Sequence, residues 1–316
     1  MGSLNMSADR GRKIGMKDRL FSKPIISDLV HELGRQDRLG TLKRIIIWQI
    51  ASRLIRRPIQ LEMAGGIKLL VKRGMHGATK NFYVGLCEYR DMAFAMHYAG
   101  PDEILFDVGA NVGVYSLIFS SRRGRAIAFE PVPETFSALA ANVSLNNVND
   151  LVAKENIGVG SADGSINFTI DKDATNHVVA LGGETASSLS VPVTSLDSYS
   201  AKHDVFPTII KIDVEGFETE VLSGCTRILD ERASRPNVII VELNGLGARY
   251  GYNDDDIDVR LRSYGYRPCT YDPQERELSE LSAYNRSSNT LYVYDMELAK
   301  AKVSGSKSIY WSSLSI

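Results

Sequence analysis

From residue 104 onward, short apolar runs alternate with longer segments in which apolar residues recur at helical spacing. The apolar runs predict strands at 104–108, 126–129, 151–157, 209–212 and 238–243. The segments between them predict helices at 114–121, 134–145 and 218–229. This order is typical of βαβ units around a parallel sheet, so the pattern predicts an α/β domain.

Residues 161–193 interrupt the alternation. Two apolar runs, 166–170 and 189–193, flank a polar stretch through Gly182 and Gly183, which predicts an inserted β-hairpin. An insertion at this edge of a sheet often shapes a substrate pocket. Near the C-terminus, 266–270 and 290–294 predict a final pair of strands, and we expect the serine-rich tail from Lys300 to be loosely held.

The N-terminal part differs in charge from the rest. Residues 1–80 hold about seventeen Lys/Arg but about six Asp/Glu, although the net charge of the chain is −1. Residues 42–57 alternate apolar and basic positions and end before Pro58, which predicts a basic amphipathic helix. We expect it to pack on the catalytic domain, and the alternative is contact of residues 41–57 with an anionic membrane surface. Nucleic-acid binding is not expected, because no fold signature accompanies the charge.

The chain of 316 residues is long enough for one large domain with an extension. We expect a basic, mostly helical extension at 1–80, a catalytic domain at 81–298 and a tail at 299–316. The three cysteines lie far apart without a CxxC pair, which argues against zinc and disulfides. No apolar stretch approaches the length of a membrane span or of a signal peptide, so the sequence predicts a cytoplasmic protein.

Residues 104–115 predict a buried strand that runs into a glycine turn and then a helix. Glycine permits a positive φ and lets a ligand approach the backbone closely. Gly109 and Gly113 are four residues apart, whereas the dinucleotide fingerprint needs its first two glycines two residues apart. Asp107 places an anion beside the turn, which disfavours phosphate and suits a cationic amino-acid group.

A second predicted strand ends at Glu130, about 20 residues beyond the glycine turn. This is the usual distance for an acid that accepts hydrogen bonds from ribose hydroxyls. The alternative is that Glu130 only caps the next helix. The order and spacing of the two motifs together favour a nucleoside cofactor.

These motifs resemble the FkbM family of class I methyltransferases over roughly residues 80–295. The shared segments are Phe106-Asp-Val-Gly-Ala-Asn-Val-Gly-Val-Tyr-Ser116, Ala128-Phe-Glu-Pro131, Thr194-Ser-Leu-Asp197 and Lys211-Ile-Asp-Val-Glu-Gly-Phe-Glu218. The resemblance implies a Rossmann-like, seven-stranded, mostly parallel sheet with a reversed final strand, and S-adenosylmethionine as cofactor. It implies methyl transfer to hydroxyl groups, often on sugars, glycolipids or polyketides.

The resemblance also assigns cofactor-binding residues. The methionine part of the cofactor would be surrounded by Asp107, Gly109, Ala110, Asn111 and Gly113. Glu130 would bind the ribose, and the stretch Asn156-Ile-Gly158 would lie at the adenine edge. Many class I methyltransferases have an acidic residue where this chain has Asn156.

The fourth and fifth predicted strands end in carboxylates. A hydroxyl acceptor needs a general base, and Asp213 is our first candidate. Strand alternation would turn Glu215 to the same side, so the two acids would act together or, with Glu242 and Asn244, hold a divalent cation. Metal dependence stays open, and no metal ligand is predicted. The alternative is that Asp213 and Glu215 cap the following helix.

Three further polar residues receive structural interpretations. Asp197 is expected to cap a helix or close a turn, and His177 and His203 are expected to be ordinary surface or core groups.

The leading functional hypothesis is therefore O-methylation of a hydroxyl on a sugar, glycolipid or polysaccharide. Two alternatives remain: an NAD-linked oxidoreductase, and a membrane-associated binding protein with a degenerate cofactor fold. The sequence discloses neither the acceptor nor the oligomeric state.

Overall fold

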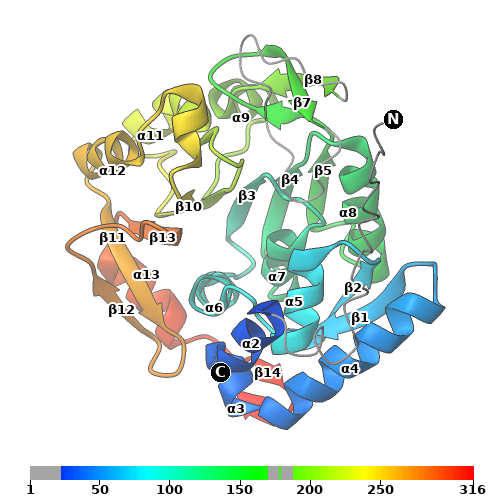
Figure 1. The fold of residues 1–316 in the computed structure, drawn as a ribbon. Coiled ribbons are helices and arrows are strands. Elements are labelled where there is room, and N and C mark those ends of the chain that lie inside the picture. Colours follow the sequence, from blue (N-terminus) through cyan, green and yellow to red (C-terminus); the bar gives the residue numbers. More distant parts are fainter. Residues whose placement is uncertain (1–22, 170–177, 179–187) are drawn as a thin grey trace, which may run out of the picture.

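The computed structural model describes residues 23–169, 178 and 188–316. Its centre is an eight-stranded sheet in the order β12-β11-β13-β10-β9-β3-β4-β5 (Figure 1). The strands are β3 (Ile104–Val108), β4 (Arg125–Phe129), β5 (Val152–Glu155), β9 (Ile209–Ile212), β10 (Val238–Leu243), β11 (Arg267–Asp272), β12 (Glu277–Glu280) and β13 (Ser288–Val293).

Strands β5, β4, β3, β9 and β10 run parallel, and β13 is antiparallel to both β10 and β11. This confirms the Rossmann-like, mostly parallel sheet with its reversed strand. The expected count of seven strands is one too few, because β12 pairs antiparallel with β11 at the sheet edge. Its segment has a single apolar residue, Leu278, so β12 forms through backbone pairing across a short turn and gives no hydrophobic signal.

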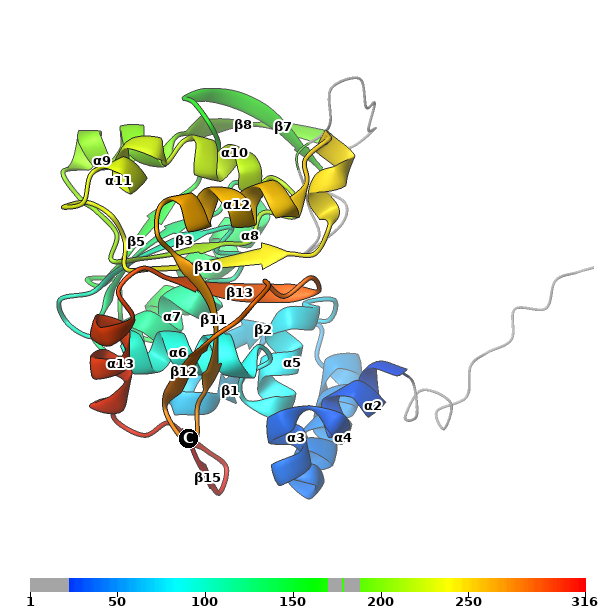
Figure 2. The same ribbon diagram turned by 90° about the vertical axis from the view of Figure 1, so that its left-hand side faces the viewer.

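Helices cover both faces of this sheet (Figure 2). Because side chains alternate along a strand, Leu105 and Phe106 enter the cores on opposite faces. The two helical layers separate clearly in the side view. One layer holds α6 (Tyr89–Tyr98), α7 (Val114–Ser121), α8 (Pro133–Leu145) and α13 (Met296–Ser304), and the other holds α9 (Leu196–His203), α10 (Glu218–Ser223), α11 (Thr226–Asp230) and α12 (Asp254–Ser263).

The five predicted parallel strands and the first two predicted helices are present. The single helix predicted at 218–229 is wrong, since the chain forms α10 and α11 on either side of Gly224. A Cβ at Gly224 would lie 2.1 Å from the carbonyl oxygen of Gly160, so the helix break accompanies a close backbone approach.

The predicted hairpin is also present. Strand β7 (Gly164–Thr169) pairs antiparallel with β8 (Ser188–Thr194), and β6 (Gly158–Val159) joins them in a separate three-stranded sheet. The strand predicted at 151–157 is therefore shorter, because the chain leaves the main sheet after Glu155. Gly182 and Gly183 lie outside the described residues.

The N-terminal segment packs on the domain instead of standing apart. Leu33, Ile45 and Trp48 are buried in the same core as β3. This segment comprises α2 (Lys23–Val30), α3 (Glu32–Gln36), α4 (Arg38–Leu54), β1 (Ile59–Met63), the 3-10 turn η1 (Ala64–Gly66), β2 (Ile67–Val71) and α5 (His76–Val84). The expected amphipathic helix is α4, and its inner face packs on the domain.

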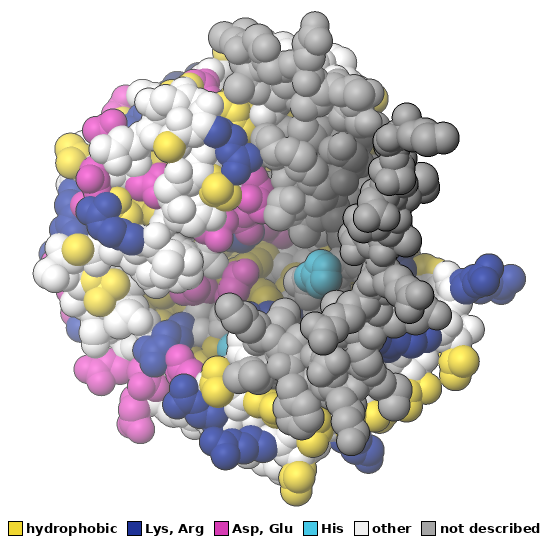
Figure 3. Space-filling model, in the orientation of Figure 1, with side chains coloured by type: hydrophobic (Ala, Val, Ile, Leu, Met, Phe, Trp, Pro, Cys, Tyr) yellow, Lys and Arg dark blue, Asp and Glu magenta, His cyan; other side chains and the backbone are white. Residues whose placement is uncertain are grey.

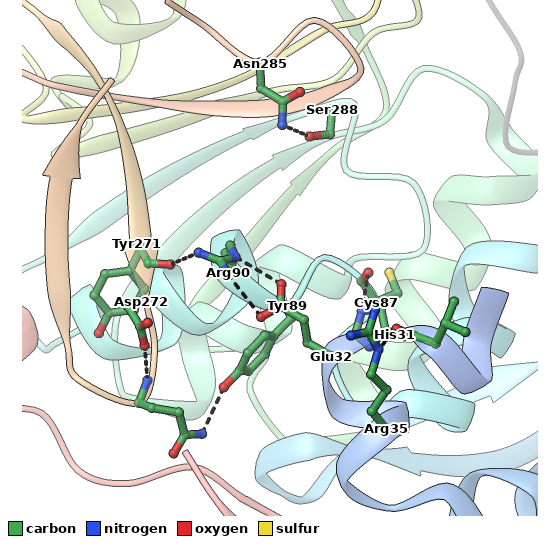
Figure 4. A network of polar contacts seen from close by, with 12 residues as sticks. His31, Glu32, Arg35, Cys87, Tyr89, Arg90, Tyr271, Asp272, Asn285 and Ser288 are labelled. Carbon is green, nitrogen blue, oxygen red and sulfur yellow. Dashed lines mark hydrogen bonds and ion pairs between the residues drawn. The ribbon is translucent and has the colours of Figure 1, made fainter. Parts of the chain in front are cut away.

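Polar contacts fasten the N-terminal helices to the sheet (Figure 4). Arg90, in α6, bonds through its Nε to Glu32 Oε1 at 3.1 Å and donates to the carbonyl oxygen of Tyr271 in β11. The ring of His31 lies 3.1 Å from the carbonyl oxygen of Cys87.

The C-terminal tail is ordered, so the expectation of a loosely held segment is wrong. Strands β14 (Tyr310–Trp311) and β15 (Leu314–Ser315) pair with one another, and Ile309, Trp311 and Ile316 are buried in the main core. These apolar residues stand among serines in the sequence, so the composition of the tail did not indicate that it packs on the core. Among the described residues, no helix combines the length and apolarity needed to cross a bilayer.

Candidate active site

The sheet has its topological switch point between β3 and β9. From β3 the chain proceeds to β4 and β5 on one side, and it later builds β9 and β10 on the other. Ligands of open α/β sheets bind at the carboxyl ends of the strands at such a point. A cavity of about 390 Å³ opens here, and acidic side chains gather beside a hollow in this face of the molecule (Figure 3).

The glycine turn forms the floor of this cavity. Gly109 has a φ of 78°, and a Cβ there would lie 1.9 Å from the carbonyl oxygen of Asp213. The backbone N–H groups of Gly109 and Ala110 both donate to the carbonyl oxygen of Phe129. Gly109, Ala110 and Asn111 line the cavity. Gly113 does not line it; with a φ of 87°, it begins α7 against Leu139.

Asp107 is buried at the end of β3. Its Oδ2 accepts hydrogen bonds from the backbone N–H and the hydroxyl of Ser116, and its Oδ1 has no partner among the described residues. Burial raises the pKa of Asp107, and the charge of Lys211 opposes this effect. A buried acceptor without a partner at the cavity wall is suited to a cationic or hydrogen-donating ligand.

Glu130 accepts two hydrogen bonds from the backbone, one of them at the start of a helix. Its Oε2 accepts from the N–H of Asn111 at 3.0 Å, and its Oε1 accepts from the N–H of Val132, the N-cap of α8, at 2.9 Å. Burial raises the pKa of Glu130 to about 7, although both hydrogen bonds lower it. A carboxylate oxygen has two lone pairs, so each oxygen can accept one further bond from a ligand in the cavity.

Gly158 lines the other end of the cavity, where Phe168 of the hairpin supplies an apolar wall. Asn156 is not a lining residue. Its side-chain amide donates to the carbonyl oxygens of Glu130 and Pro131, so it shapes the strand-end loop.

The structure pairs Asp213 with a buried cation that the sequence interpretation did not use. Lys211 Nζ lies 2.7 Å from Asp213 Oδ2, and the Lys211 side chain is only 4% exposed. Burial alone would raise the pKa of Asp213, but the attraction of Lys211 holds it below its ordinary value. Glu242, from the end of β10, is hydrogen-bonded to Asp213, and burial together with the negative charge of Asp213 raises the pKa of Glu242. Asp213 is therefore the ionised member of this carboxyl pair.

Glu215 also lines the cavity, but the argument from strand alternation is wrong. Strand β9 ends at Ile212, and Glu215 has a left-handed φ of 55°. The interpretation of Asp213 and Glu215 as helix caps is wrong as well. The N-cap of α10 is Phe217, and Glu218 Oε1 accepts from the N–H groups of Val214 and Gly216 in the preceding loop.

A second group of hydrogen-bonded polar residues lies behind Lys211, and the sequence did not predict it. Glu88 Oε2 accepts from the Tyr115 hydroxyl at 2.7 Å and from the Asn289 amide at 2.8 Å. The ammonium group of Lys211 lies 5.1 Å from the centre of the Tyr115 ring. Lys211 and Tyr115 both stand in the quoted motifs, but only the fold brings Glu88 to them.

The remaining sequence candidates lie away from this chemistry. Asp197 accepts from the N–H groups of Arg227 and Ile228, which confirms a helix cap. His203 stacks on Tyr199 with ring centres 4.3 Å apart, and His177 lies outside the described residues. Asn244 Oδ1 accepts from the N–H of Leu246 in its own loop. Within the described parts of the chain, no cluster of three or more His, Cys, Asp or Glu is arranged to hold a metal ion.

Comparison with known proteins gives one family. Residues 107–268 match the family described as the methyltransferase FkbM domain, which is about half of the chain. The chain is 34% identical over 149 residues to the hexuronic acid methyltransferase AglP of Haloferax volcanii, covering 46% of this chain and 58% of that protein. It is 24% identical over 200 residues to the 31-O-demethyl-FK506 methyltransferase FkbM of Streptomyces tacrolimicus, covering 52% and 73%.

A crystal structure of methyltransferase FkbM from Methylobacillus flagellatus superposes with a TM-score of 0.40 at 17% identity, covering 80% of this chain and 59% of that chain. The match to AglP covers 58% of that protein, so the chain spans less than two thirds of its length. The matched family segment begins at Asp107 and includes the glycine turn, Glu130 and the Lys211–Asp213 pair. The chain belongs to the FkbM methyltransferase family.

Proposed function

We propose that this protein transfers a methyl group from S-adenosylmethionine to a hydroxyl group of a sugar, glycolipid or polysaccharide. The observation that carries the proposal is that one cavity is lined both by residues suited to a nucleoside cofactor and by a candidate general base. Glu130 and the glycine turn form one part, and Asp213 with its buried partner Lys211 forms another.

The proposed cofactor fits the residues at the first part. Gly109 and Ala110 line the cavity, and Asp107 presents a buried oxygen without a partner among the described residues to the cationic amino-acid end. Glu130 would accept bonds from the ribose hydroxyls with the lone pairs that Asn111 and Val132 leave free. When bound, S-adenosylmethionine supplies the electrophilic methyl group.

Asp213 is the proposed general base. The charge of Lys211 keeps its carboxylate ionised, and a carboxylate at the cavity wall can accept the proton of an acceptor hydroxyl. Glu215 is the second candidate, and its pKa is raised by burial and by Asp213. General base catalysis contributes about 10² to 10⁴ in rate, and positioning of the acceptor contributes further.

The acceptor class rests on one relative whose name gives a hexuronic acid as substrate, so we favour a hydroxylated sugar. No comparison favours the NAD-linked oxidoreductase. A cytoplasmic location stays a prediction.

The test is transfer of labelled methyl from S-adenosylmethionine to neutral glycosides, uronates and polysaccharides. In the Asp213→Asn variant, kcat should fall by about 10² or more while S-adenosylhomocysteine still binds in calorimetry. Retained binding shows that the variant is folded, so lost transfer reports on the chemistry. Glu231→Gln, at an exposed surface site, is the control and should leave kcat unchanged. Absence of transfer to every hydroxylated acceptor would contradict the proposal.

A further inference from the structure

Helix α4 has an outer face that the fold leaves uncovered. While Ile45 and Trp48 are buried on its inner side, Leu39, Ile50 and Leu54 are 84%, 56% and 78% exposed. Two further isoleucines on this helix, Ile46 and Ile47, are also exposed, as is Ile55 directly after it. Leu39, Ile46, Ile50 and Leu54 recur at helical spacing along the outer side of α4, and the exposed Lys43 lies among them; we call these apolar side chains the stripe.

The flanks of this stripe are basic and contain no acid. Residues 38–57 hold six Lys/Arg and no Asp or Glu. Arg44 is turned inward, where it pairs with Asp37 and donates to the carbonyl oxygen of Tyr83 in α5. The exposed cations on or just beyond α4 form no salt bridge with any described residue; they are Arg38, Lys43, Arg53, Arg56 and Arg57.

The space-filling view agrees with this arrangement. Apolar and basic side chains follow one another along the margin of the molecule where α4 runs (Figure 3). The inner face of α4 packs on the domain, and its outer face exposes apolar side chains next to cations. This distribution of apolar and basic residues is the one found in helices that lie at a membrane interface. Exposed leucine or isoleucine residues are ordinary when scattered singly, whereas several on the same side of one helix are not.

We propose that the outer face of α4 docks the protein on an anionic lipid surface. The apolar side chains enter the boundary between headgroups and acyl chains, and the five cations that form no salt bridge with a described residue contact anionic headgroups. The charge favours a lipid surface over a second copy of the chain. The basic residues beside the apolar side chains are attracted to an anionic bilayer, whereas they would repel the same basic residues of a second copy.

Docking through α4 would also affect the site. Arg44 ties α4 to α5, and α5 contributes His76, Gly77 and Asn81 to the cavity wall. The membrane would therefore contact α4, which is hydrogen-bonded directly to α5, and α5 borders the cavity. The docking surface itself does not depend on the proposed methyl transfer, and the test below measures no activity.

The experiment is co-sedimentation of the full chain with large vesicles. We expect binding to vesicles of phosphatidylglycerol and phosphatidylcholine, little binding to phosphatidylcholine alone, and weaker binding in 1 M salt, where the Debye length is about 3 Å. Ile50→Glu should weaken the partition coefficient by about tenfold, and Arg53→Gln by about fivefold. The control Val259→Glu, at a 66% exposed site on α12, should bind as the unmodified protein does.

Three results would overturn the proposal. The first is absence of sedimentation with anionic vesicles at low ionic strength. The second is equal loss of binding in Val259→Glu and Ile50→Glu, which would mean that α4 has no special part. The third is a dimer in analytical ultracentrifugation that Ile50→Glu separates, since this face would then be an interface between copies. Thermal unfolding at an unchanged midpoint establishes that the substitutions leave the fold intact.

Discussion

Replacement of Lys211 by methionine tests the electrostatic arrangement of the site. The ammonium group is buried 2.7 Å from Asp213, and the charges of Asp107 and Glu88 also act on it. Although burial disfavours its charged form, these three carboxylates raise the pKa of Lys211. Removal of one partner of a buried pair leaves an uncompensated charge and costs about 3 to 5 kcal/mol. We expect a loss of this size in the free energy of unfolding at pH 8.

The loss should depend on pH. In the unmodified protein the folded-state pKa of Asp213 is depressed, so its contribution to stability is present above its unfolded pKa of about 3.8 and is lost as the pH falls through the folded value. Without Lys211, burial raises the folded-state pKa of Asp213, and the variant takes up a proton more readily than the unmodified protein. The difference in stability between the two proteins should therefore shrink as the pH is lowered from 8 toward 5.

Urea denaturation of both proteins at the two pH values measures this difference. Lys72→Met is the matched control, because Lys72 pairs with Glu134 where both side chains are exposed. Such a pair contributes about 1 kcal/mol or less. If Lys211→Met loses the same free energy at pH 5 as at pH 8, or no more than Lys72→Met, the account of a charge held by a buried ion pair is wrong.

Glu130→Gln should weaken S-adenosylhomocysteine binding in calorimetry by about tenfold or more, because a charged acceptor is lost, and unchanged affinity would argue against ribose binding. The folded-state pKa of Glu130 is raised to about 7, so this group contributes stability that is present below pH 4.5 and is lost as the pH rises through 7. The free energy of unfolding of the ligand-free protein should fall by about 3 kcal/mol over this range because of Glu130, and a flat stability profile would contradict this expectation. Gly109→Ala should destabilise strongly, since its Cβ would meet the Asp213 carbonyl, whereas Gly100→Ala has open space and should change the melting temperature little. Trp311→Ala should cost about 3 to 5 kcal/mol in denaturation, and a loss near zero would mean that the tail does not support the core.

Features specified by contiguous residues were predictable. The apolar run of β3, the following glycine turn and the helix α7 stand within one short segment, and the distance to Glu130 is a distance along the chain. The inserted hairpin and the amphipathic character of α4 are local as well, because periodicity and turn residues specify them. For these elements, the sequence was enough to predict the parallel sheet.

Other features arise only from packing between distant segments. Lys211 acquires its role when β9 lies between β3 and β10, which brings Asp107 and Glu242 to it, while the N-cap of α6 supplies Glu88. In this assembly burial raises the pKa of Glu242, whereas the attraction of Lys211 lowers the pKa of Asp213, and no local pattern encodes either effect. The left-handed backbone at Glu215, the added strand β12 and the buried tail likewise depend on what packs against them. Local residues determined the elements and their order, whereas long-range packing decided which charges meet, because only the folded chain excludes water from between them.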